Sequence, residues 1–173
     1  MGKSSRDLLF EIEQTMGDTW LPEIYRQILR SRTRAYQFPA ISHKTKSQIQ
    51  HTLLGIELKI GRRRMLCPDL ATARYLAIFA RIGAKAVAIP YDITQISQAA
   101  DALDSSWHRM FLIGDSLAAG KSTAFRARLR QALIGKVRGE ISEAGAGPVV
   151  PRFRQDVKAS ATRRIARRPR AQH

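Results

Sequence analysis

The alternation of apolar and charged residues from Ile56 to Ile60 constrains the fold of this chain more than any other feature. A period of two is typical of a strand with one buried face. Gly61 and Arg62 follow directly, and glycine at the first central position suits a two-residue type II′ turn. We therefore predict a β-hairpin in which a second strand returns beside the first. Its register would place Lys59 opposite Arg64 and Leu58 opposite Met65.

A helix and a third strand are predicted to follow the hairpin. Pro68 ends the second strand because proline cannot donate to a ladder, and Asp69 is well placed as a helix N-cap. A broad apolar face then continues to Gly83, a residue that suits a helix C-terminus. The short apolar run from Ala86 to Ile89 is typical of a strand that is covered on both faces.

The remaining segments are predicted to be mostly helical. We expect a first helix capped by Ser5, and a second that begins at Asp18 or Thr19 and continues through Arg34. A polar connector would occupy residues 39–52. Ser105 and Ser106 would separate two further helices, and Ser122 would cap the last one.

These elements predict an α+β fold in which a small three-stranded sheet, made of the hairpin and one further strand, packs with helices. The sheet would comprise residues 53–60, 63–67 and 85–90. The compact domain would span residues 1–144 and include a basic last helix. Residues 145–173 are rich in arginine and poor in apolar residues, so we expect a disordered basic tail.

Charge is distributed unevenly along the 173 residues, whose net charge is +16. Residues 1–118 hold 16 Lys or Arg against 11 Asp or Glu, whereas residues 119–173 hold 14 against 3. Such asymmetry indicates a polyanionic partner, and nucleic acid (DNA or RNA) is the commonest one inside a cell. A single cysteine, Cys67, excludes an intrachain disulfide framework. With no apolar run long enough for a membrane span, we expect a cytoplasmic protein with no membrane partner.

Four cations surround the predicted hairpin turn: Lys59, Arg62, Arg63 and Arg64. One interpretation is a solvated turn whose charge protects a sheet edge from pairing. The favoured interpretation is a projecting hairpin that contacts phosphates. Two interpretations are also open for the arginines at 30, 32 and 34, which form either a solvated helix end or a phosphate contact zone.

The favoured function is therefore non-catalytic nucleic-acid binding through phosphate contacts, with no cofactor. The basic helix would add cations on its solvent side, and the tail would add affinity. The predicted contact residues beyond the hairpin are Lys121, Arg126, Arg128, Arg130, Lys136, Arg138, Arg163, Arg164, Arg167 and Arg168. An alternative is an assembly protein whose basic tail binds an acidic protein partner.

Another alternative is an enzyme. Glu57, Lys59 and Asp69 resemble the carboxylate and Glu-x-Lys metal site of the restriction-endonuclease-like nucleases. The resemblance implies that the carboxylates hold Mg²⁺ and that the lysine helps to activate water. That family places its aspartate on the strand before the Glu-x-Lys pair, whereas Asp69 follows the pair and suits a helix cap.

The segment from Gly114 to Thr123 resembles the phosphate-binding loop of nucleoside triphosphatases. Its first glycine stands one residue too early, and Asp115 occupies the glycine position. We interpret the segment as a helix that ends at Gly120, followed by a helix that Ser122 caps.

Overall fold

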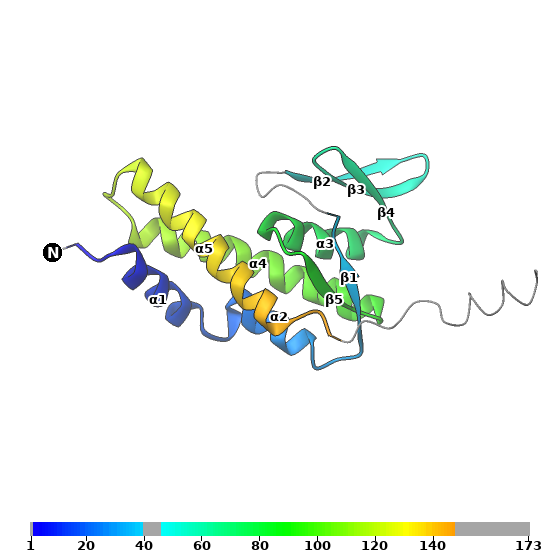
Figure 1. The fold of residues 1–173 in the computed structure, drawn as a ribbon, viewed down its shortest axis with the longest axis horizontal. Helices are drawn as coiled ribbons and strands as arrows, with labels where there is room; N and C mark the ends of the chain where they lie inside the picture. Colours follow the sequence, from blue (N-terminus) through cyan, green and yellow to red (C-terminus); the bar gives the residue numbers. More distant parts are fainter. Residues whose placement is uncertain (1, 40–45, 148–173) are drawn as a thin grey trace, which may run out of the picture.

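The computed structural model describes residues 2–39 and 46–147 of the chain. Figure 1 shows long helices on one side of the molecule and a small sheet on the other, with a short central helix between them. The α+β class predicted from the sequence is confirmed. The helices are α1 (Ser5–Met16), a 3₁₀ turn η1 (Gly17–Thr19), α2 (Leu21–Ile28), α3 (Leu70–Ile82), α4 (Ile93–Leu117) and α5 (Thr123–Ala144). The strands are β1 (Thr33–Gln37), β2 (Ser47–Thr52), β3 (Gly55–Ile60), β4 (Arg63–Cys67) and β5 (Ala86–Pro90).

The predicted hairpin is present as β3 and β4. Lys59 lies opposite Arg64 and Leu58 opposite Met65, as expected. Gly61 has φ 59°, a left-handed value that suits glycine in a tight turn. The strand begins at Gly55, whereas residues 53 and 54 form the preceding turn. Local sequence therefore determines this hairpin and its register.

The third strand of this sheet differs from the expectation. It is β2, which pairs with β3 in an antiparallel ladder and occupies part of the predicted polar connector. The inner face of the sheet packs on α3. Leu58 and Ile60 are buried there, and the Ser47 hydroxyl donates to the Ala77 carbonyl of α3 at 3.3 Å. A single inward apolar residue, Ile49, made β2 hard to recognise in the sequence.

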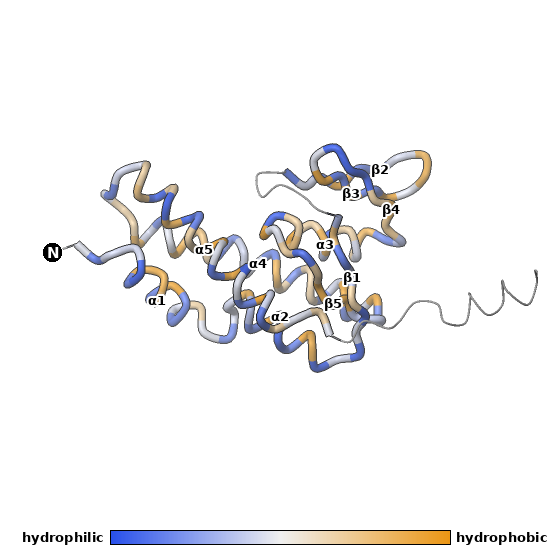
Figure 2. The backbone as a smooth tube through the Cα atoms, in the orientation of Figure 1, coloured by the Kyte–Doolittle hydropathy of each residue, from blue (hydrophilic) through white to orange (hydrophobic). Residues whose placement is uncertain are grey.

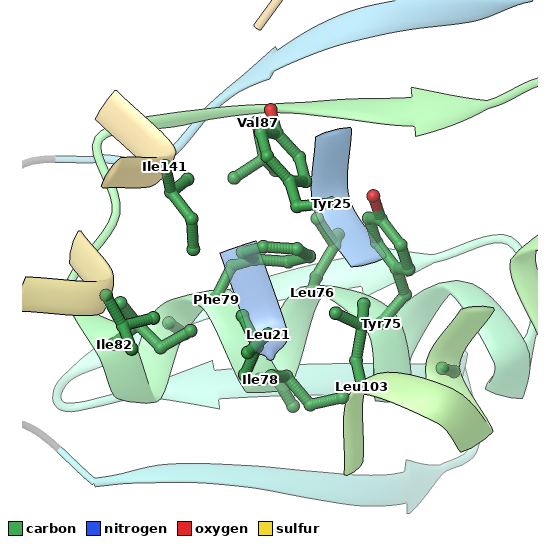
Figure 3. Close-up of a cluster of buried hydrophobic side chains, with 14 of the residues drawn as sticks. Leu21, Tyr25, Tyr75, Leu76, Ile78, Phe79, Ile82, Val87, Leu103 and Ile141 are labelled. Atoms are coloured by element: carbon green, nitrogen blue, oxygen red, sulfur yellow. The ribbon is translucent and has the colours of Figure 1, made fainter. Parts of the chain in front are cut away.

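Helix α3 is the centre of the core. Asp69 caps its first turn as predicted, accepting from the Thr72 amide at 2.7 Å, and Gly83 ends it with φ 81°. The helix contacts the three-stranded sheet on one side and α4 on another. The ring of Phe79 on this helix lies close to those of Tyr25 and Tyr75, at centroid distances of 5.3 and 5.0 Å (Figure 3). Such burial on several faces explains its broad apolar surface.

The predicted strand at Ala86–Pro90 exists, but it pairs with β1 and not with the hairpin. Helix α2 stops at Ile28, although we expected it to continue through Arg34. The start of the segment that pairs with β5 was therefore predicted as the end of this helix. The other edge of β5 is closed by two tyrosines: the Ala88 amide donates to the Tyr25 hydroxyl at 2.9 Å, and the Tyr75 hydroxyl donates to the Ala88 carbonyl at 2.6 Å. At this edge of β5 the two tyrosine hydroxyls thus make the hydrogen bonds that a neighbouring strand would make.

The two helices expected around Ser105 and Ser106 are one continuous helix, α4. Ser106 is buried and its hydroxyl donates to the Thr19 carbonyl at 2.6 Å. The residue predicted to interrupt the helix therefore attaches it to η1. Gly114 lies inside α4 and Ser122 caps α5, so the segment resembling a phosphate-binding loop is a helix end and a helix start. Helix α4 ends at Leu117, three residues before the predicted end at Gly120.

Smaller corrections concern the N-terminus and the ends of the chain. Ser4, not Ser5, caps α1 in a capping box with Asp7. Helix α5 ends at Ala144, and most of the tail predicted for residues 145–173 lies outside the described residues. None of the helices within residues 2–39 and 46–147 is both long and apolar enough to cross a membrane.

Candidate nucleic-acid interface

The β3–β4 turn carries its cations into solvent. Arg62, Arg63 and Arg64 are exposed, and Lys59 is half-buried. None of the four forms an ion pair within the described part of the chain. Figure 2 shows this end of the sheet as strongly hydrophilic and the turn between β2 and β3 as apolar; that turn contains the exposed Leu53 and Leu54. The hairpin tip, as we call residues 59 and 62–64, is thus an uncompensated positive surface.

The register of β3 and β4 places two of these cations opposite each other. Lys59 and Arg64 are directly opposite each other on neighbouring strands, where side chains on the same face are closest. Like charges in such a pair repel and destabilise the sheet. Glu57 shares this outer face but forms no ion pair with either cation. An external anion bound here would relieve the repulsion.

The cations of α5 are divided between solvent and internal partners. Lys136, Arg138 and Arg130 were expected to face water, but the structure corrects this for the first two. Lys136 bridges Glu13 at 3.0 Å and Glu140 at 3.3 Å, and the Arg138 Nε donates to the Ile82 carbonyl at 2.7 Å.

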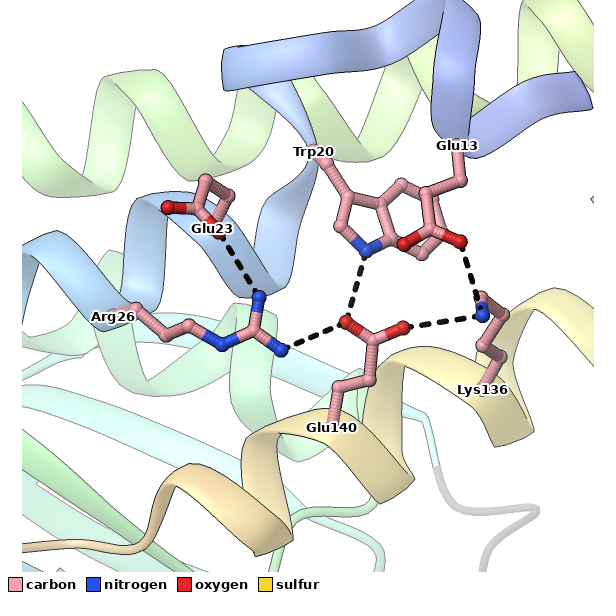
Figure 4. Close-up of polar contacts among 6 residues, drawn as sticks. All are labelled: Glu13, Trp20, Glu23, Arg26, Lys136 and Glu140. Carbon is pink, nitrogen blue, oxygen red and sulfur yellow. Dashed lines mark hydrogen bonds and ion pairs between the residues drawn. The ribbon is translucent and has the colours of Figure 1, made fainter. Parts of the chain in front are cut away.

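Lys136 belongs to the polar network of Figure 4, in which Glu140 also accepts from Trp20 and Arg26 at 3.1 and 3.0 Å. Burial alone lowers the pKa of Lys136, but hydrogen bonds and charges from Glu13 and Glu140 outweigh it, so its pKa is raised. This lysine stabilises the packing of α5 and has little freedom to contact a ligand.

Arg130 is also engaged, since its guanidinium forms two hydrogen bonds with Asp115. Lys121, Arg126 and Arg128 remain exposed and form no ion pair in residues 2–39 and 46–147. Figure 1 places the start of α5 beside the N-terminus, at the end of the molecule far from the hairpin. The structure therefore does not gather the predicted cations into one patch. The tail residues Arg163, Arg164, Arg167 and Arg168 lie outside the described residues.

Arg32 and Arg34 form a second cationic group, which we had predicted at the end of a helix. Because residues 33–37 form a strand and not a helix end, Arg32 and Arg34 lie near each other, against the exposed ring of Tyr91. Their guanidinium carbons are 5.0 and 5.9 Å from the centroid of that ring. Tyr91 was not among the predicted site residues, and its only signal was its position directly after the β5 strand.

A groove of about 180 Å³ separates the edges of β1 and β4. The Tyr36 hydroxyl crosses between the strands and donates to the Met65 sulfur at 2.7 Å. Burial raises the pKa of Tyr36 and that of Cys67, so both stay neutral near pH 7. The groove walls include Arg34, Tyr36, Leu66, Cys67, Thr72 and Leu76.

The two carboxylates of the nuclease alternative have different surroundings in the structure. Both carboxylate oxygens of Asp69 are engaged by Thr72, at 2.7 Å with its amide and 3.0 Å with its hydroxyl. Glu57 is 8% exposed, accepts from Thr52 at 3.3 Å, and leaves its Oε2 without a partner in the described structure. Within the described ranges no group of three or more His, Cys, Asp or Glu could hold a metal ion. Asp69 has the structural role of a helix cap.

Comparison with known proteins adds no assignment. No protein-family model, no curated protein and no solved structure was found to match this chain.

Proposed function

We propose that this chain is a non-catalytic nucleic-acid-binding protein that holds the phosphate backbone through its hairpin tip. The observation that carries the proposal is the directly opposed pair of Lys59 and Arg64, with Arg62 and Arg63 beside it. Within residues 2–39 and 46–147 no carboxylate is paired with any of them. Phosphate contacts of this kind supply affinity that depends steeply on salt.

An extended polymer suits the two separated groups of cations. Arg126 and Arg128 lie near the start of α5, a helix of 22 residues that spans about 33 Å, and Lys121 lies just before it. A small anion can occupy only one of the two groups. A polynucleotide carries phosphates along its whole length and reaches both, so the arrangement favours nucleic acid over a compact acidic ligand.

The test is a comparison of two triple variants of equal charge. In the first, Arg62, Arg63 and Arg64 are replaced by Gln. In the control, Arg74, Arg81 and Arg130 are replaced by Gln; each of these forms an ion pair, with Asp101, Asp104 and Asp115. Binding of labelled oligonucleotides is measured by fluorescence anisotropy at several salt concentrations.

The hairpin variant is expected to bind at least tenfold more weakly, and the slope of log K against log salt should fall by about 2 to 3, because each lost phosphate contact removes about 0.7 to 0.9. The control should stay close to the parent chain. Equal losses in both variants would contradict the proposal. So would polyglutamate that binds as tightly as nucleic acid, which would favour the acidic-partner alternative. Cleavage with Mg²⁺ that Glu57→Ala abolishes would favour a nuclease.

A further inference from the structure

Tyr91 and its two arginines form an unusual exposed surface. Tyr91 is 50% exposed, although Arg32 and Arg34 both lie over its ring. Neither arginine forms an ion pair in the described structure. An exposed aromatic residue with guanidinium groups beside it is the combination on which nucleobases stack while the neighbouring phosphates are neutralised.

The groove between β1 and β4 adjoins this surface, because Arg34 belongs to both. Ala35 and Leu66 line the groove from its two sides. The Ala88 peptide groups bond to Tyr25 and Tyr75, so Ala35, the residue opposite Ala88, directs its own peptide groups away from β5.

The same alternation applies to β4. A two-residue turn makes Ile60 and Arg63 a hydrogen-bonded pair, so Leu66 is in a non-bonded position and its peptide groups point away from β3. The groove therefore has a backbone donor and acceptor on each side, and Arg34 is the one charged residue among the described residues that line it. Its volume of about 180 Å³ has room for one planar heterocycle and not for a double helix.

We propose that the nucleic acid is single-stranded, with one base in the β1–β4 groove, the next base stacked on Tyr91, and their phosphates on Arg32 and Arg34. This inference rests on the proposed function and specifies its polymer. A duplex keeps its bases stacked and paired, so it reaches neither the groove nor the tyrosine ring. An acidic peptide strand added to the free edge of β4 is the competing occupant, but the groove is too small for a strand with its side chains.

The experiment uses the full chain and three labelled polymers of equal phosphate number: oligothymidylate, the same backbone with abasic sugars, and a duplex. The abasic backbone retains the phosphates and removes the bases. Oligothymidylate should bind at least tenfold more tightly than the abasic strand, since stacking contributes that much for a single base. Tyr91→Leu should remove about tenfold of the oligothymidylate affinity and leave the abasic strand and the duplex unchanged. Tyr91→Phe, which keeps the ring, should behave as the parent chain.

The two proposals fail in different ways. Equal binding of oligothymidylate and the abasic strand by the unmodified chain would overturn the single-strand inference, even if Tyr91→Leu failed to fold. Hairpin-dependent binding to all three polymers would leave the proposed function intact. Displacement of the oligonucleotide by an acidic peptide, with no effect of Tyr91→Leu, would assign this surface to a protein partner and overturn the inference. Absence of binding to every polymer would overturn both proposals.

Discussion

Two buried tyrosines determine how the edge of β5 is closed. Tyr25 and Tyr75 hydrogen-bond to the two peptide groups of Ala88, and Tyr25 also donates to the Gly145 carbonyl at 2.7 Å. Burial, the largest cause, raises the pKa of both phenols above the ordinary value of 10.0. Because the sites favour the neutral phenol, ionisation is coupled to unfolding.

The sign of this coupling gives a prediction for alkaline pH. Above about pH 10 the unfolded chain releases phenolic protons that the folded chain retains, so the free energy of unfolding should fall as pH rises. Tyr75→Phe should weaken this pH dependence and, at neutral pH, cost about 1 to 3 kcal/mol by leaving the buried Ala88 carbonyl without a donor. Urea unfolding at about pH 8 and about pH 11 checks both.

The matched control for this change is Tyr91→Phe, which removes an exposed hydroxyl. It should leave the free energy of unfolding within about 0.5 kcal/mol of the parent chain. A stability that stays constant to strongly alkaline pH, or equal effects of the two substitutions, would contradict the role assigned to Tyr75.

At the level of elements, sequence was informative where the signal is local. The alternation from Ile56 to Ile60, the turn at Gly61 and the cap at Asp69 each act within a few residues, and all are present as predicted. Strands β1 and β2 were missed for different reasons. The partner of β1 lies some 50 residues away, and β2 has one inward apolar residue. Propensity and periodicity contain no direct information about such tertiary pairing.

The same limit explains Ser106. Serine weakly disfavours helix interiors because its hydroxyl competes for backbone groups. In α4 the hydroxyl instead reaches the Thr19 carbonyl of η1. Ser106→Ala should therefore destabilise the fold by about 1 kcal/mol, although alanine is the better helix former. Ser105→Ala, at an exposed position, should be neutral or slightly stabilising. Thermal and urea unfolding of both variants measure the difference, and equal stabilisation by both would show that the contact with η1 contributes nothing.

At the scale of the whole molecule, the sequence indicated how much positive charge there is but not how it is arranged. The hairpin tip follows from local register and could be predicted completely. The cluster of Arg32, Arg34 and Tyr91 could not, because it requires the β1–β5 pairing. Internal partners also occupy Lys136, Arg138 and Arg130, and of these partners the sequence spacing indicates only Glu140, four residues after Lys136. Burial of a cation depends on which helices pack together.

Affinity and discrimination should therefore come from different parts of the chain. The tail arginines lie outside the described residues, and their abundance predicts a contribution from phosphate neutralisation alone. Replacing Arg163, Arg164, Arg167 and Arg168 by Gln in the full chain should weaken binding to single strands and to duplexes by the same factor. The slope of log K against log salt should become less steep by about 3 to 4. The ratio between the two affinities should not change, because neutralisation of phosphates by arginine side chains does not depend on the bases.

Titrations of both polymers at several salt concentrations measure the slope and the ratio together. The Tyr91→Leu variant provides the reciprocal case, in which the ratio falls and the salt slope is retained. If the tail variant instead bound single strands and duplexes equally well, the tail would distinguish the polymers and the folded surface would only add charge. The two variants thus separate a polycation from a structured site in one set of measurements, since salt dependence counts phosphates and the ratio reports contact with bases.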